Sequence, residues 1–329
     1  MDKEIILVTG GAGFIGSHLC EALLKQNKKV VIVDNFNDFY DPTIKYRNIE
    51  EIKKTMKKNQ IDENNLILFK EDIRNLDGID KIFKQYTPVT VVHLAAMAGV
   101  RPSIQDPLLY EEVNVKGTLN ILEMCKKHKI KSFIFASSSS VYGNNKKVPF
   151  SEDDPVDNPI SPYAATKKAG ELFCYTYHSL YDINVACLRF FTAYGPRQRP
   201  DLAIHKFTKL IMEDKEIPFY GDGSSQRDYT YIDDIIDGVV KAIDWVQKEG
   251  KRYEIFNLGE SNTISLLEMV KTLEEVIGKK AKIKYLPMQQ GDVEKTYAKI
   301  LKAKTYLLYC PNKRFKEGIK SFILWYDQI

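Results

Sequence analysis

The architecture of this chain is set by the stretch Ile5-Ile6-Leu7-Val8-Thr9-Gly10-Gly11-Ala12-Gly13-Phe14-Ile15-Gly16. Its apolar start predicts a buried strand, its glycines predict a tight turn, and the apolar residues that follow at helical spacing predict a helix. Such a turn lets the backbone approach a pyrophosphate, while the start of the helix supplies N–H groups and partial positive charge. A turn that is rich in glycine only for close packing is the alternative interpretation.

An acidic residue follows at the position that a dinucleotide requires. Asp34 ends the second predicted strand, 18 residues after Gly16. A carboxylate at this place can hold both hydroxyls of a ribose. Because it would repel a 2′-phosphate, the sequence predicts NAD rather than NADP as the cofactor.

Short β-rich runs alternate with longer segments of helical periodicity along most of the chain. This alternation is typical of a parallel sheet with helices on both faces. We therefore expect an α/β protein with a doubly wound parallel sheet of Rossmann type. The predicted strands are Ile5–Val8, Val30–Val33, Leu66–Phe69, Val89–Leu94, Phe133–Ala136, Val185–Leu188 and Tyr253–Phe256.

The regular alternation breaks after Arg189, where a stretch rich in Pro, Arg and Gly begins. Amphipathic helices are predicted further on, at 266–277 and 315–326, and they indicate a smaller second domain that closes over the first. The polar, Lys-rich segment 36–65 predicts a solvated helix. The expected boundaries are residues 1–189 with about 229–258 for the first domain, and about 190–228 with 259–329 for the second.

Composition excludes several classes of protein. The 329 residues are 44% hydrophobic and 28% charged, which is typical of a globular chain. A net charge of +4 is too small and too dispersed to predict a nucleic acid or a membrane as partner. The five cysteines and five histidines are scattered, so we expect reduced thiols and no metal site. With neither a signal segment nor a long apolar run, the sequence predicts a cytoplasmic enzyme or binding protein.

A second group of residues carries chemistry. Tyr163 and Lys167 are four residues apart and therefore share one face of a predicted helix. Ser138 lies 25 residues before Tyr163. A tyrosine with an ordinary pKa of about 10 must act as a base near neutrality, and nearby cations such as Lys167 and a bound nicotinamide favour the phenolate. A Tyr–Lys pair on a helix surface, with serines as caps, is the alternative.

The glycine spacing and the Ser…Tyr-x-x-x-Lys set resemble the short-chain dehydrogenase/reductase superfamily. The resemblance implies that Tyr163 is the base, that Lys167 assists it, and that Ser138 orients the substrate hydroxyl. The cofactor-binding residues that it implies are Gly10, Gly13, Phe14, Ile15, Gly16, Asp34, Asn35, Asp72, Ile73, Leu94, Ala95, Ala96, Asn114, Ser137, Tyr163 and Lys167. For Asp72, the stretch His93–Ala96 and Asn114, taken singly, capping or packing is an equal alternative.

Nearly the whole chain resembles the extended members of this superfamily, the NAD-dependent epimerase/dehydratase family, which act on nucleotide sugars. The stretches that carry this resemblance are Ser137–Gly143, Ser161–Tyr163, Arg189–Phe191, Tyr194–Pro196 and Arg227–Asp234. It implies that the smaller domain binds the nucleotide sugar, with Arg227 facing the diphosphate and Asp292 reaching the uridine ribose. A solvated arginine and a helix-capping aspartate are the alternatives.

The two residues that directly follow the catalytic serine differ between the reaction types of the family. Dehydratases resemble Thr-Asp-Glu there and decarboxylases keep a Glu, because those reactions need acids and bases. This chain has Ser139 and Ser140, which can only form hydrogen bonds. The resemblance therefore implies an epimerase, in which hydride leaves C4, the 4-keto sugar turns over, and hydride returns to its other face.

Four further stretches resemble the branch of the family that converts UDP-glucuronate into UDP-galacturonate: 33–41, 97–103, 189–201 and 291–296. This implies that Ser139, Ser140 and Thr192 hydrogen-bond the sugar carboxylate. Arg199 and Arg101 would add positive potential, with a surface ion pair as the alternative for each. A homodimer through helices near 119–125 and 172–180 is a further implication.

Other functions stay open. The nearest is UDP-glucose 4-epimerase or another enzyme that modifies UDP-sugars. Because a fold does not fix a function, a non-catalytic protein that senses NAD or associates with RNA is another. A third is an oxidoreductase that releases NADH.

Overall fold

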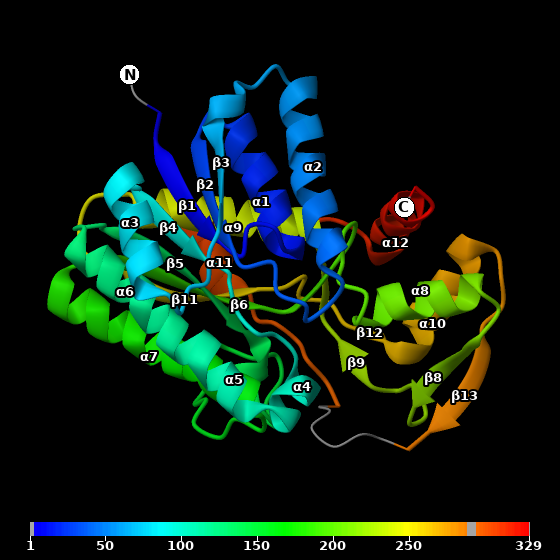
Figure 1. Cartoon of the computed structure of the whole chain (residues 1–329). Coiled ribbons are helices and arrows are strands. Elements are labelled where there is room, and N and C mark those ends of the chain that lie inside the picture. Colours follow the sequence, from blue (N-terminus) through cyan, green and yellow to red (C-terminus); the bar gives the residue numbers. More distant parts are fainter. Residues whose placement is uncertain (1–2, 288–293, 329) are drawn as a thin grey trace.

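The computed structural model describes residues 3–287 and 294–328. A seven-stranded parallel sheet lies at its centre, in the order β11-β6-β5-β4-β1-β2-β3 (Figure 1). All seven predicted strands are confirmed, with ends within two residues of those expected. The strands are β1 (Ile5–Thr9), β2 (Lys29–Asp34), β3 (Leu66–Lys70), β4 (Thr90–His93), β5 (Ser132–Ser138), β6 (Asn184–Phe190) and β11 (Tyr253–Leu258).

Helices cover both faces of this sheet, as a doubly wound fold requires. One face carries α1 (Phe14–Lys25), α2 (Pro42–Lys58) and α9 (Ile232–Val246), and the other carries α3 (Leu76–Tyr86), α6 (Gly117–Lys127) and α7 (Pro162–Tyr181). Successive side chains of a strand point to opposite faces. In β1, Ile6 and Val8 therefore enter one hydrophobic core and Leu7 enters the other.

A smaller lobe lies beside the sheet, at the right of Figure 1. The helices predicted at 266–277 and 315–326 are confirmed as α10 and α12. The further elements of the C-terminal half are β7 (Thr192–Tyr194), α8 (Ala203–Met212), β8 (Glu216–Tyr220), β9 (Gln226–Arg227), β10 (Tyr229–Tyr231), β12 (Ile264–Ser265), α10 (Leu266–Ile277), β13 (Lys282–Leu286), α11 (Leu301–Leu307) and α12 (Phe315–Tyr326). The division into two domains stays a prediction, since α11 packs on α9 and β11 of the large sheet.

The predicted site residues gather where the strand order reverses. The chain passes from β1 to β2 and β3 on one side, then returns to β4 on the other side of β1. Such a switch point leaves a crevice at the carboxyl ends of the strands, which is where ligands bind in open α/β sheets. In the part of the chain that the structure describes, no helix is long and apolar enough to cross a bilayer.

Candidate active site

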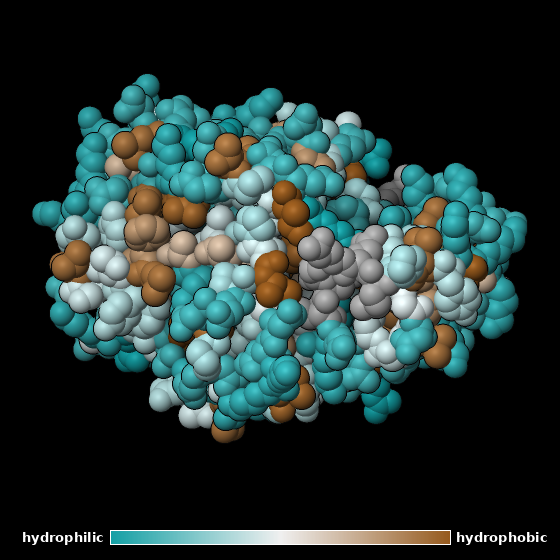
Figure 2. Space-filling view, turned by 90° about the horizontal axis from the view of Figure 1, so that it is seen from below, coloured by the Kyte–Doolittle hydropathy of each residue, from teal (hydrophilic) through white to brown (hydrophobic). Residues whose placement is uncertain are grey.

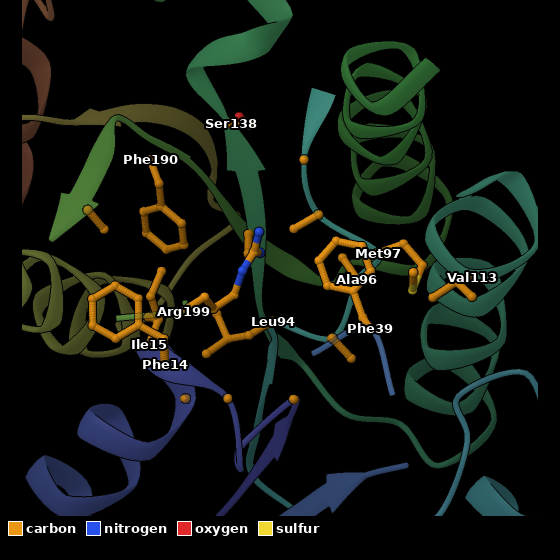
Figure 3. A pocket seen from close by; sticks show the side chains of 18 of the residues that line it. Phe14, Ile15, Phe39, Leu94, Ala96, Met97, Val113, Ser138, Phe190 and Arg199 are labelled. Atoms are coloured by element: carbon orange, nitrogen blue, oxygen red, sulfur yellow. The ribbon is translucent and has the colours of Figure 1, made fainter. Parts of the chain in front are cut away.

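A pocket opens at this switch point, with about 380 Å³ available to the centres of water molecules. Most of the site residues expected from the sequence line it: Gly10, Gly13, Phe14, Ile15, Gly16, Asp34, Asn35, Ile73, Leu94, Ala95, Ala96, Ser137, Ser138, Ser139, Ser140, Tyr163, Lys167, Thr192 and Arg199. Figure 3 shows the Arg199 side chain in the middle of this pocket, between Phe190 and Phe39.

The glycine turn brings β1 against the segment after β4. Gly10 has a φ of +70°, and a Cβ atom there would lie 2.8 Å from the backbone nitrogen of Ala95. A Cβ atom on Gly16 would lie 2.2 Å from the carbonyl oxygen of Gly10. Helix α1 then starts at Phe14 without a side-chain cap on its first N–H groups. An uncapped helix start that faces a pocket fits a diphosphate.

Asp34 lies at the pocket end of β2. Its two carboxylate oxygens accept hydrogen bonds from the N–H groups of Ala12, at 3.1 Å, and Phe36, at 2.9 Å. The Lys45 ammonium is 3.9 Å from the same carboxylate. Burial raises the pKa of Asp34, and Lys45 with the two N–H groups counteracts that rise. The arrangement fits a carboxylate that is held ready for ribose hydroxyls.

The segment after β2 contributes lining residues that the sequence patterns did not reveal. Helix α2 confirms the helix expected in 36–65, and Tyr46 in its first turns is 47% exposed, but the neighbouring Lys45 is only 6% exposed. Lys45 donates to the carbonyl and side-chain oxygens of Asn37, which folds the segment back over the pocket. The residues missed in this way are Asn37, Phe39, Tyr40, Lys45 and, after β3, Glu71.

Two expected cofactor residues lie behind the lining rather than in it. Asp72 accepts hydrogen bonds from Arg74 and, at 2.9 Å, from the side chain of Asn35. Burial acts to raise the pKa of Asp72, but these bonds outweigh it and lower the pKa to about 2. Asn114 is buried, at 2% exposed, and bonded to Met97 and Thr166.

The three expected catalytic residues converge. Ser138 ends β5, and Tyr163 and Lys167 lie in the first turns of α7. The Ser161 hydroxyl caps this helix by accepting a hydrogen bond from the N–H of Ala164. The Lys167 ammonium donates to the Ala136 carbonyl oxygen at 2.7 Å. Burial lowers the pKa of Lys167 to about 8.

Burial also raises the pKa of the Tyr163 phenol, while Ser138 and Arg199 act to lower it. We expected Lys167 to lower this pKa. Ser138 and Arg199 act in this direction, and the Lys167 ammonium lies 5.9 Å from the centre of the Tyr163 ring, so its effect on this pKa stays a prediction. The effect of burial is the larger one, so the pKa of the phenol stays above its ordinary value. The phenol therefore needs further positive charge beside it to act as a base near neutrality.

The hydroxyl groups form a cluster on one short turn. Ser139 and Ser140 belong to a 3-10 turn at Ser139–Tyr142, where the Ser138 hydroxyl donates to that of Ser140 at 3.1 Å. Among the described residues that line the pocket, only Asp34 and Glu71 are acidic. Asp34 ends β2 and Glu71 follows β3, and three strand spacings separate β5 from β2, roughly 14 Å. The serine turn therefore has no carboxylate beside it among these lining residues.

Of the three expected arginines, Arg199 lines the pocket, where it is paired with Asp201. Arg101 instead stacks on the Tyr220 ring, with its guanidinium carbon 5.4 Å from the ring centre. Arg227 donates to the carbonyl oxygen of Gln226 at 2.9 Å, and Asp292 lies outside the described residues.

The fold and this pocket together define a dinucleotide-binding α/β protein of Rossmann type. A family model described as GDP-mannose 4,6 dehydratase matches residues 7–322, so the chain belongs to that family. The chain is 45% identical to a UDP-glucuronate 4-epimerase of Thermodesulfobacterium geofontis, over 97% of this chain and 95% of that one.

Solved structures of related enzymes have the same fold. A Bacillus cereus UDP-glucuronic acid 4-epimerase, crystallised with UDP-glucuronic acid and NAD, has a TM-score of 0.89 and is 40% identical, over 98% of this chain and 99% of that one. A Thermotoga maritima UDP-glucose 4-epimerase with UDP-glucose has a TM-score of 0.87 and is 31% identical, over 98% and 99%. The α/β fold class and the family resemblance expected from the sequence are confirmed.

Proposed function

We propose that this chain is an NAD-dependent enzyme that epimerises UDP-glucuronate at C4, giving UDP-galacturonate through a transient 4-keto sugar. One observation carries the proposal. Ser138, Tyr163 and Lys167 converge in a dinucleotide pocket whose neighbouring Ser139–Ser140 turn offers hydroxyls instead of acids. The relatives named as UDP-glucuronate 4-epimerases support the choice of substrate.

The pocket fits NAD at three places. The N–H groups at the start of α1 would hold the diphosphate, the glycine turn leaves room for it, and Asp34 would hold the adenosine ribose. When bound, NAD supplies a hydride acceptor for C4 and a positive charge near the sugar. We keep Asn35, Ile73, Leu94, Ala95, Ala96 and Ser137 as proposed cofactor contacts.

The chain itself moves the proton. Tyr163, as phenolate, would take the proton of the 4-hydroxyl group and return it after the keto sugar has turned over. Ser138 would orient that hydroxyl, and Arg199 supplies a positive charge that favours the phenolate. Because the same group takes and returns the proton, no net acid or base is consumed.

The sugar carboxylate poses a chemical problem, because oxidation at C4 creates a β-keto acid that loses CO₂ readily. Ser139, Ser140 and Thr192 line the pocket and would hold the carboxylate out of line with the carbonyl, with Arg199 adding charge. We expect little pentose product for this reason. Arg227, Asp292 and Arg101 stay proposed contacts of the UDP part.

The family name includes a dehydratase, but the lining argues against elimination of water. Such a reaction needs an acid and a base beside the sugar. The acidic groups among the described lining residues, Asp34 and Glu71, belong to the far strands β2 and β3.

The test is NMR of the products formed from UDP-glucuronate and from UDP-glucose, first without and then with added NAD. We expect UDP-galacturonate, with Tyr163→Phe losing turnover while NAD still binds. Turnover of UDP-glucose alone would indicate the neutral-sugar epimerase, and predominant UDP-xylose would contradict the role of the hydroxyl cluster. Stoichiometric NADH at 340 nm would indicate an oxidoreductase, and NAD binding without turnover a binding protein.

We further propose a homodimer through α6 and α7. Helix α7 leaves Leu172, Tyr175 and Leu180 between 56% and 64% exposed. Figure 2 shows hydrophobic residues gathered on the side of the molecule where these helices lie. Light scattering should give the mass of a dimer for the wild type and of a monomer for Leu172→Asp, and a monomeric wild type would contradict the proposal.

All five cysteines lie within the described residues and are unpaired, and four of them are buried. Reduced thiols are typical of the cytoplasm, which we propose as the location.

A further inference from the structure

A histidine that the reaction does not use lies under the pocket. His93 ends β4, is 1% exposed, and has both ring nitrogens bonded. Its Nδ1 is 2.7 Å from the hydroxyl of Thr9, which ends β1 just before the glycine turn, and its Nε2 is 3.0 Å from the hydroxyl of Thr118, on α6. One ring therefore connects the end of β1, next to the glycine turn, to helix α6.

The neighbouring bonds fix where the proton of this ring lies. The Thr118 hydroxyl donates to the carbonyl oxygen of Asn114 at 2.6 Å, so it must accept from His93, and Nε2 carries the proton. Nδ1 then accepts from the Thr9 hydroxyl, which itself accepts from the N–H of Ala95 at 3.2 Å. All donors along this path point the same way.

The ring stays neutral in this arrangement. Burial and the Lys167 cation lower the pKa of His93 to about 3, and its ring lies beside those of Phe133 and Phe135. A charged imidazole would donate from Nδ1 as well, and the Thr9 hydroxyl would then lose the acceptor of its own proton. The neutral ring is thus the form that satisfies every bond in the path.

The path ends on the catalytic helix. Asn114 lies in a π-helical turn, Glu112–Lys116, and its side chain bonds both the N–H and the carbonyl of Met97, at 2.8 and 2.9 Å. It also donates at 3.0 Å to the Thr166 hydroxyl, which donates at 2.8 Å to the carbonyl oxygen of Tyr163. Asn114 thereby joins the pocket wall at 94–97 to the backbone of the proposed base.

We propose that His93 is a positioning residue: through Thr118 it holds the π-helical turn of Asn114, and through Asn114 it sets the distance between the 94–97 wall and Tyr163. The inference rests on the proposed function, because the wall would hold the nicotinamide side of NAD and Tyr163 the sugar. Hydride transfer needs near-contact geometry, and a displacement of about 1 Å can cost roughly a hundredfold in rate. His93 itself touches no reacting atom.

The test uses a matched pair at the link between His93 and Asn114. Thr118→Val keeps the shape and loses the hydroxyl, whereas Thr118→Ser keeps the hydroxyl. We expect Thr118→Val to lower kcat about tenfold or more, to change KM less than about twofold, and to raise the isotope effect with substrate deuterated at C4. Thr118→Ser should restore kcat to within about threefold of the wild type.

Equal kcat and equal isotope effects in the two variants would overturn the inference, even if Thr118→Val unfolds more easily. If Thr118→Val does not fold, the matched pair is made at Thr166, beside Tyr163. Thr166→Val breaks the path there and Thr166→Ser keeps it, and we expect the same contrast in kcat and in the isotope effect. A wild type that leaves UDP-glucuronate unchanged contradicts the proposed function instead, and the pairs are then compared on the UDP-hexose that it does convert.

Discussion

Arg199 pairs with Asp201 through two hydrogen bonds, from Nε to Oδ1 at 3.0 Å and from Nη2 to Oδ2 at 2.7 Å. The side chain of Asp201 is 42% exposed, whereas that of Arg199 is 17% exposed and points into the pocket (Figure 3). The Asp201 carboxylate thus already pairs with Arg199, the cation that we propose for the carboxylate of the sugar.

Asp201 should therefore compete with the substrate. We expect Asp201→Asn to lower KM for UDP-glucuronate about two- to fivefold, since a partly exposed ion pair contributes roughly 0.2–1 kcal/mol. Steady-state kinetics with UDP-glucose, which has no carboxylate, provides the control and should show no gain. An unchanged or higher KM for UDP-glucuronate would mean that Arg199 does not meet the sugar carboxylate.

The pH dependence should follow the environment of Tyr163. The phenol must lose its proton to act as a base, so kcat rises with pH through its pKa. Because the Ser138 hydroxyl lowers this pKa, Ser138→Ala should move the acid limb of the kcat profile to higher pH. Ser139→Ala is the control, and its acid limb should stay in place even if its rate falls. Equal limbs in the two variants would remove Ser138 from this role.

Cofactor choice should depend on Asp34 and Lys45. Asp34→Ser removes the acceptor for the ribose hydroxyls and leaves the Lys45 ammonium, 3.9 Å from that carboxylate in the native chain, available to a 2′-phosphate. We expect the affinity for NAD to fall roughly tenfold or more and that for NADP to rise. Calorimetric titration measures both. Adding Lys45→Met should abolish the gain for NADP, and a gain that survives this change would place the phosphate elsewhere.

A buried ion pair supports the catalytic helix. Glu171 of α7 accepts two hydrogen bonds from Arg189 of β6, at 2.8 and 2.9 Å, and both side chains are 1% exposed. Removing one charge of such a pair costs about 3–5 kcal/mol, so Glu171→Gln should lower the free energy of unfolding by that amount in urea titrations. Glu50→Gln, which breaks the exposed pair with Lys53, should change it by less than about 0.5 kcal/mol. Similar losses in the two variants would contradict this account.

Much of this molecule could be predicted from its sequence, because the governing signals are local. Each strand of the large sheet is a short apolar run, and the glycine turn and the Tyr163–Lys167 pair are spacings within a single element. Parallel strands then bring their carboxyl ends together without further information, which is why most of the expected residues line one pocket.

The rest depends on contacts between distant segments. The spacing of apolar residues in 36–65 does not indicate that Lys45 donates hydrogen bonds to Asn37 and so holds the preceding residues over the pocket. Asn114 is expected at the cofactor, which stays a prediction, but its bonds to Met97 and Thr166 could not be foreseen from the sequence. In the sequence His93 is only the first residue of the stretch His93–Ala96, and the role that we propose for it depends on the two partners of its ring, Thr9 and Thr118.

The short turn that carries Ser139 and Ser140 has an evolutionary consequence. It projects from the end of β5, while Asp34 and the glycine turn lie at the ends of β2 and β1, so mutations at Ser139 and Ser140 leave those two parts of the proposed cofactor site unchanged. A lineage could thus exchange isomerisation for elimination by altering a few adjacent codons, with no new scaffold and no new cofactor.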